Sequence, residues 1–159
     1  MAERLRSAQG IADGRRIVAT GIEAALRTRY TYDTLRGLRR RFPRAQFVWL
    51  MGADNLVQLP RWQHWIGIAK TMPFAVVPRP TYNPRALAGQ AARTLRHYRV
   101  PARAAPALAS KKAPAWVFLP APQNPISATA LRAIRAMAWL RASAHRIERS
   151  KTVKELHHI

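Results

Sequence analysis

The sequence predicts an α/β fold in which helices cover both faces of an open, mostly parallel sheet. Short runs rich in Val, Ile, Phe and Trp alternate along the chain with longer segments whose apolar residues recur at helical spacing. The short runs are almost continuously hydrophobic, which is typical of parallel strands buried on both faces. Four strand and helix units in series favour a parallel sheet with helical connections.

Each element can be assigned in order from the same pattern. The expected strands are residues 15–23, 46–51, 74–78 and 115–119. The expected helices are residues 32–41, 61–70, 84–98 and 127–140. Each helix begins near a capping residue or a proline, and these are Thr31, Pro60, Pro84 and Ser127. The stretch 99–114, rich in Pro, Ala and basic residues, is expected to be a long surface loop.

Composition limits the class of protein. With 159 residues and 48% hydrophobic content, the chain can build one domain, which we assign to residues 1–140, followed by a basic tail at 141–159. A net charge of +21 favours a polyanionic partner: a nucleotide, a nucleic acid or an acidic membrane surface. The lack of cysteine excludes thiolate chemistry and disulfides and fits a reducing compartment. Without a membrane-spanning run or a secretory signal, we expect a cytoplasmic protein.

Asp54 is the only carboxylate between Asp33 and Glu148, and it follows the apolar run FVWLM. Ligands of open parallel sheets bind outside the carboxyl ends of the strands, where Asp54 is expected to lie. Its carboxylate can accept hydrogen bonds from sugar hydroxyls or amines, and Gly52 permits close backbone approach. The alternative is an ordinary turn formed by the Asp and Asn55.

Polar residues also follow the other strands. Tyr30 and Thr31 stand at a helix N-terminus whose free amides suit an anion, although a helix cap and a packed Tyr are the alternative. Trp62 could offer a stacking face to an aromatic ring, or it could be a core residue that shares a helix face with Trp65. Arg79, between two prolines, could bind a phosphate or be merely solvated.

The segment after the last strand, PQNPISATALR, suggests a phosphate site. Ser127 and Thr129 place hydroxyls on the first turn of a helix, and Arg132 follows one turn later. An ordinary capped helix is the alternative. The five histidines lack acidic neighbours at metal-binding spacing, so no metal site on the protein is expected.

Four motifs in this order resemble bacterial nicotinate-nucleotide adenylyltransferase, over about residues 1–135: YTYDTL, FVWLMGADNLVQLPRW, VVPRP and ISATALR. That enzyme joins ATP and nicotinate mononucleotide during NAD synthesis. The resemblance implies a Rossmann-like nucleotidyltransferase fold, transfer of the adenylyl group, and Mg²⁺ bound with ATP as the cofactor.

The resemblance also implies roles for the candidate residues. Tyr30 and Thr31 match the segment that receives the nicotinate carboxylate, Asp54 matches the acid on the mononucleotide side, and Trp62 matches the Trp that stacks on the pyridine ring. The residues that match ATP and phosphate contacts are Arg79, Ser127, Thr129 and Arg132. Gln63 stands where the family often has a second aromatic residue.

One departure from the family affects the expected activity. The family's N-terminal strand and its G-G-x-F-x-P-x-H-x-G-H segment have no match in this chain, so no catalytic residue can be assigned. We therefore expect an N-terminally truncated domain that lacks its first central strand and has impaired catalysis. A basic nucleic-acid-binding module and an inactive fragment are the alternative functions.

Overall fold

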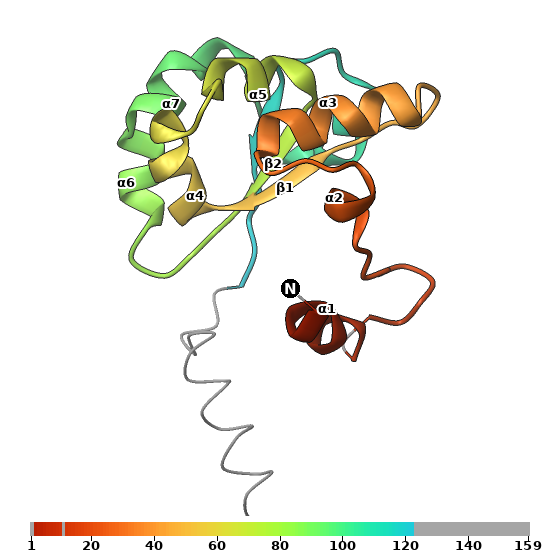
Figure 1. The fold of residues 1–159 in the computed structure, drawn as a ribbon. Helices are drawn as coiled ribbons and strands as arrows, with labels where there is room; N and C mark the ends of the chain where they lie inside the picture. Colours follow the sequence, from red (N-terminus) through yellow and green to blue (C-terminus); the bar gives the residue numbers. More distant parts are fainter. Residues whose placement is uncertain (1, 11, 123–159) are drawn as a thin grey trace, which may run out of the picture. The chain divides into compact units, whose positions relative to one another are not determined.

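A four-stranded parallel sheet forms the centre of the computed structural model, which describes residues 2–10 and 12–122 (Figure 1). The strands are β1 (Trp49–Gly52), β2 (Phe74–Val77), β3 (Arg99–Val100) and β4 (Trp116–Phe118). Their order is β1-β2-β4-β3, and every neighbouring pair is parallel. The α/β class and the parallel sheet that the sequence predicts are therefore confirmed.

The strands are connected by short helices. The α-helices are α1 (Ala2–Gln9), α2 (Ile22–Ala25), α3 (Thr31–Arg41), α4 (Ala53–Gln58), α5 (Trp65–Thr71), α6 (Asn83–Ala88) and α7 (Gln90–Thr94). The 3-10 helices are η1 (Leu59–Arg61), η2 (Arg96–Tyr98) and η3 (Ala102–Ser110). None of the helices in the described part of the chain is long and apolar enough to cross a membrane.

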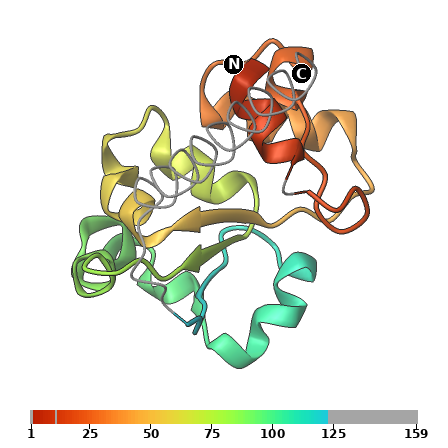
Figure 2. The same cartoon turned by 90° about the horizontal axis from the view of Figure 1, so that it is seen from below.

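Alternating side chains of the strands form two separate cores. Phe74 and Trp116 are buried on one face, where their rings stack 5.8 Å apart among side chains from α3 to α7. The Trp116 indole also donates a hydrogen bond to the Leu95 carbonyl, 2.8 Å away, so its one polar group is satisfied. On the other face Ala75 and Val117 pack against Leu108 of η3. Figure 2 shows η3, in teal, across the sheet from α5.

The strand predicted at 15–23 is wrong. Residues 17–21 are irregular, Ile17 and Val18 are 59% and 61% exposed, and the segment ends in α2. The cause is Asp13, whose Oδ1 accepts hydrogen bonds from the amides of Arg15, Arg16 and Ile17 at 2.9, 2.7 and 2.8 Å. A side chain that takes these amides competes with the ladder bonds that a strand needs.

Two predicted helix starts also need correction. Helix α3 begins at Thr31, with Tyr30 as its cap residue and no side-chain capping bond, so Thr31 is not the cap. The helix predicted at 61–70 begins only at Trp65, because His64 adopts a left-handed conformation with φ 54°. Trp62 therefore precedes α5 and does not share a helix face with Trp65.

Three further segments differ from the predicted secondary structure. The segment after β1 is not a turn, since α4 starts directly at Ala53. The helix predicted at 84–98 is broken at Gly89, which is extended between α6 and α7. The predicted loop 99–114 contains β3 and η3. The helix predicted at 127–140, with its Ser127 cap, and the domain boundary at 140 lie outside the described residues.

Candidate functional site

A cavity of about 480 Å³ gathers three of the predicted site residues. Tyr30 and Thr31 reach it from the start of α3, and Trp62 reaches it from the segment after η1. The remaining lining residues are Arg29, Arg61, Gln63 and Ile68. The structure therefore brings together an aromatic face, a helix N-terminus and two guanidinium groups. In the part of the chain that the structure describes, no carboxylate lines the cavity.

Hydrogen bonds fix the beginning of α3 beside this cavity. The Tyr30 carbonyl accepts bonds from the amide and the hydroxyl of Thr34, at 3.1 and 3.2 Å. The Thr34 hydroxyl is also 2.7 Å from that of Thr28, which ties the preceding segment to the helix. Tyr30 is 50% exposed, and the Arg29 guanidinium lies 6.0 Å from the centroid of its ring. One wall of the cavity thus has a set position and a positive rim.

Close packing of α3 on α5 sets the opposite wall. A Cβ on Gly67 would lie 2.6 Å from the Tyr32 ring, so only glycine lets the two helices approach this closely. The Tyr32 ring also lies 5.0 Å from the His64 ring, between centroids. This contact holds the segment that carries Trp62 and Gln63 against the start of α3.

Trp62 both packs against the core and lines the cavity. Its ring lies 5.9 Å from that of Trp49 and packs against the core, so part of its surface is structural. Its amide donates to the Leu59 carbonyl at 2.9 Å, which holds the backbone after η1. The side chain nevertheless lines the cavity and remains partly exposed. A ring held in this way offers a rigid stacking face.

Asp54 and Arg79 form a separate feature at the carboxyl ends of β1 and β2. Asp54 Oδ1 lies 3.4 Å from Arg79 Nε. The Asp54 side chain is 29% exposed and that of Arg79 is 55% exposed. Oδ1 itself is buried and accepts no well-aligned hydrogen bond from the described residues. Neither residue lines the cavity of Tyr30 and Trp62, so Asp54 is joined to Arg79 and not to that set.

Gly52 makes room for this ion pair. A Cβ at this position would overlap Asp54 Oδ1 and would lie 3.0 Å from Arg79 Nε. The close approach that the sequence predicts at Gly52 is therefore present, and the groups that use it are the side chains of the protein itself.

A strained turn presents Arg79. The Arg79 carbonyl accepts a hydrogen bond from the Tyr82 amide at 3.1 Å, and its amide donates to Asn83 Oδ1 at 2.8 Å. Between them Thr81 has φ 67°, a value that type II turns require and that β-branched residues rarely adopt. Pro80 fixes the preceding position, so the turn expected at Arg79 is present.

Two arginines of the cavity were missed by the sequence reasoning. Arg29 and Arg61 directly precede Tyr30 and Trp62, and this adjacency is the signal that could have found them. Arginine is so frequent in the chain that its position alone carried little information. Three predicted phosphate-binding residues, Ser127, Thr129 and Arg132, lie outside the described residues. Where side chains are described, no three His, Asp or Glu residues come close enough to hold a metal ion.

Comparison with known proteins gives the family. No protein-family model matches the chain. A protein of Gluconacetobacter diazotrophicus is 62% identical over 130 residues, which cover 82% of this chain and 60% of the relative. A protein of Gluconobacter oxydans is 57% identical over 81% of this chain and 66% of the relative. A protein of Brucella abortus is 42% identical over 85% of this chain and 70% of the relative.

All three relatives are named probable nicotinate-nucleotide adenylyltransferase. The chain spans less than two thirds of the length of the first two. The aligned part covers more than four fifths of this chain and includes most of the described fold. The chain therefore belongs to the nicotinate-nucleotide adenylyltransferase family.

Proposed function

We propose that the chain transfers the adenylyl group of ATP to nicotinate mononucleotide, which gives nicotinate adenine dinucleotide and pyrophosphate in NAD biosynthesis. Family membership supports the reaction class. The observation that carries the choice of acceptor is the cavity that unites Tyr30, Thr31 and Trp62 with two arginines. A cytoplasmic location belongs to the same proposal.

The cavity suits a mononucleotide that carries two anionic groups. Its volume of about 480 Å³ falls within the range of small-molecule sites. In the proposed complex the pyridine ring stacks on Trp62, and the nicotinate carboxylate binds at Tyr30 and Thr31, where the free amides of α3 favour an anion. Arg29 and Arg61 are the permanent cations that line the cavity and can reach the carboxylate or the phosphate.

The proposed chemistry is a single in-line displacement. A phosphate oxygen of nicotinate mononucleotide attacks the α-phosphorus of ATP, the bond to the bridging oxygen of the β-phosphate breaks, and pyrophosphate leaves with that electron pair. Basic side chains and helix amides hold the phosphates in line and offset their charge. We assign this role to Arg79, Ser127, Thr129 and Arg132, of which Arg79 is oriented by Asp54.

We propose that Mg²⁺ reaches the site with ATP. The described side chains do not form a cluster of metal ligands, and the nearest carboxylate to the phosphate-binding arginine is already paired with it. When bound to ATP, Mg²⁺ neutralises part of the phosphate charge.

The test is direct formation of the dinucleotide. The 159-residue chain is incubated with nicotinate mononucleotide and ATP labelled at the α-phosphate, and products are separated by chromatography. We expect all transferred label in nicotinate adenine dinucleotide, together with an equal amount of unlabelled pyrophosphate, which comes from the β- and γ-phosphates. Trp62→Ala should reduce kcat/KM about tenfold or more, whereas Tyr98→Ala, an exposed aromatic outside the cavity, should leave it unchanged. Equal kcat/KM values for the two variants would contradict the proposal that this cavity binds nicotinate mononucleotide.

A further inference from the structure

We propose that the chain binds single-stranded nucleic acid in a second site, a basic groove at the opposite end of the sheet from the mononucleotide cavity. The groove has a volume of about 400 Å³. It lies where the chain enters β1, β2 and β4, with Phe47, Pro73 and Ala113 among its lining residues. Asp54 and Arg79 follow the carboxyl ends of β1 and β2, and no residue that lines the groove also lines the cavity of Tyr30 and Trp62. The groove is therefore separate from the candidate site.

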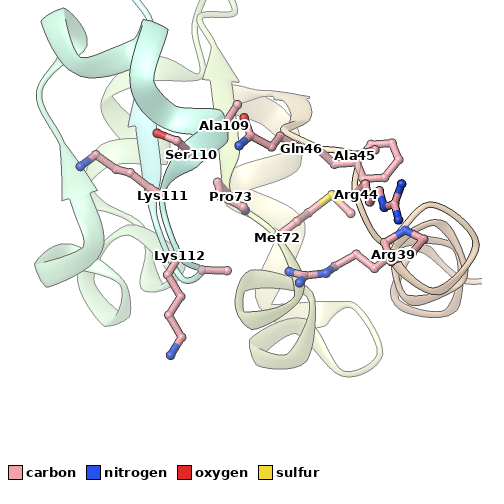
Figure 3. A pocket seen from close by; sticks show the side chains of 13 residues that line it. Arg39, Arg44, Ala45, Gln46, Met72, Pro73, Ala109, Ser110, Lys111 and Lys112 are labelled. Atoms are coloured by element: carbon pink, nitrogen blue, oxygen red, sulfur yellow. The ribbon is translucent and has the colours of Figure 1, made fainter.

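Charge is the first argument. Four cations line the groove: Arg39 and Arg44 at and just after the end of α3, and Lys111 and Lys112 directly after η3 (Figure 3). Among residues 2–10 and 12–122, no carboxylate lines the groove. Asp54 is the only acid between residues 34 and 122, and it is paired with Arg79 at the carboxyl ends of the strands. A polyanion in the groove therefore meets positive charge without a compensating acid, which raises affinity and association rate.

The direction of these side chains favours an extended ligand. Figure 3 shows Lys111 and Lys112 pointing away from one another, with Arg44 beyond Met72 and the guanidinium of Arg39 beside Met72. Arg39 is held in place because its Nη1 donates to the Thr71 carbonyl at 2.8 Å. The charges thus follow a path across the groove and do not converge on one point. Successive phosphates of a nucleic-acid strand match such a path better than one compact phosphate does.

Aromatic surface favours a single strand over a duplex. Phe47 lines the groove, and its ring lies 6.3 Å from that of Phe42, which is 40% exposed. The Arg41 guanidinium lies 5.4 Å from the Phe42 centroid, so charge and aromatic face are adjacent. Proteins that bind single strands combine a positive groove with rings on which bases stack. The base faces of a duplex are covered and cannot use these rings.

The experiment measures binding of the full chain to a fluorescent oligouridylate of about 12 nucleotides, by anisotropy at several salt concentrations. Two double variants are compared: Arg44→Ala with Lys112→Ala in the groove, and Arg85→Ala with Arg93→Ala on exposed positions of α6 and α7. Each lowers the net charge from +21 to +19, since each removes two cations. Thermal unfolding followed by circular dichroism verifies that both variants fold.

Affinity falls as salt rises, and each phosphate contact to a single strand contributes about 0.7 to the steepness of log affinity against log salt. Because the groove variant loses two cations, we expect its slope to be shallower than that of the wild type by about 1.4. The control variant should keep nearly the wild-type slope. Phe42→Leu should weaken the oligonucleotide about fivefold or more, since a stacked base is lost. A deoxyoligonucleotide of the same length identifies whether RNA or DNA is preferred.

Two results would overturn the proposal. Equal losses in the groove and control variants would mean that binding follows the net charge and not this groove. Displacement of the oligonucleotide by inorganic tripolyphosphate at equal charge concentration would mean a site for compact anions. Both readouts are independent of adenylyl transfer, so they stand whether or not the dinucleotide is formed.

Discussion

Asp54 Oδ1 lies 3.4 Å from Arg79 Nε, and this contact joins the carboxyl ends of two neighbouring strands. The sheet register explains the meeting. Gly52 of β1 is paired with Val77 of β2, and each of the two charged residues lies two positions beyond its strand partner. The one acid in a long basic stretch is thus used to orient an arginine whose side chain remains 55% exposed. Asp54 is best described as a positioning residue for Arg79.

Asp54→Asn should weaken ATP binding without unfolding the protein. Loss of the carboxylate frees the Arg79 guanidinium, and we expect the Kd for ATP to rise about fivefold or more by calorimetry. Because the pair is partly exposed, the free energy of unfolding should change by less than about 1 kcal/mol. Arg79→Lys, which keeps the charge and loses the planar fork, should give a similar rise. Wild-type affinity for ATP in both variants would show that the Asp54 and Arg79 pair has no role in ATP binding.

Gly52→Ala should destabilise the fold by about 1–3 kcal/mol, since the added Cβ overlaps Asp54 Oδ1. Urea unfolding measures the loss. Gly10→Ala is the matched control, because its Cβ would meet no atom closer than 3.7 Å. Adding Asp54→Ala to Gly52→Ala should recover part of the stability, and simple additivity of the two effects would argue against the overlap.

Thr81→Gly should raise the free energy of unfolding by up to about 1 kcal/mol. The positive φ of 67° strains a β-branched residue, and its relief outweighs the added freedom of the unfolded chain. Thr81→Ala keeps a Cβ at this conformation and should gain less. A loss of stability in the glycine variant, measured by thermal unfolding, would show that the turn is not strained.

The pKa of the Asp13 carboxyl should lie below the ordinary range of aspartate. Hydrogen bonds from the amides of Ile17, Arg15 and Arg16 favour the charged form. A lowered folded pKa means that this contribution to stability is present above the unfolded pKa and is lost as pH falls through the folded value. Carboxyl titration by NMR checks the direction, and an unshifted midpoint would contradict the bonds described for residues 13–17.

The sequence predicted three of the four described strands because their apolar runs are continuous, and such runs are typical of strands that are buried on both faces. Residues 74–78 and 115–119 contain β2 and β4, and both supply buried core residues. The prediction failed at 15–23, where a local carboxylate takes the backbone amides that pairing requires. The two-residue β3 lay inside a predicted loop, since so short a strand depends on β4 beside it.

The candidate site was predictable only in part. Tyr30, Thr31 and Trp62 were predicted from family motifs and from strand ends, of which the one before Tyr30 is absent, and the structure places all three on one cavity. Pairing of Asp54 with Arg79 could not be predicted, because it depends on the register of two strands and on the turn at Thr81. Position along the chain shows which residues follow a strand, and register decides which of them meet.

Calorimetric titration with nicotinate mononucleotide tests the central claim most directly. We expect the wild-type chain and Tyr98→Ala to bind one equivalent with the same Kd, and Trp62→Ala to bind about tenfold more weakly or worse, because the stacking face is lost. Nicotinamide mononucleotide, which lacks the carboxylate, should bind more weakly to the wild type. Equal binding to Trp62→Ala and the wild type, or no binding to the wild type, would contradict the assignment of this cavity to the mononucleotide.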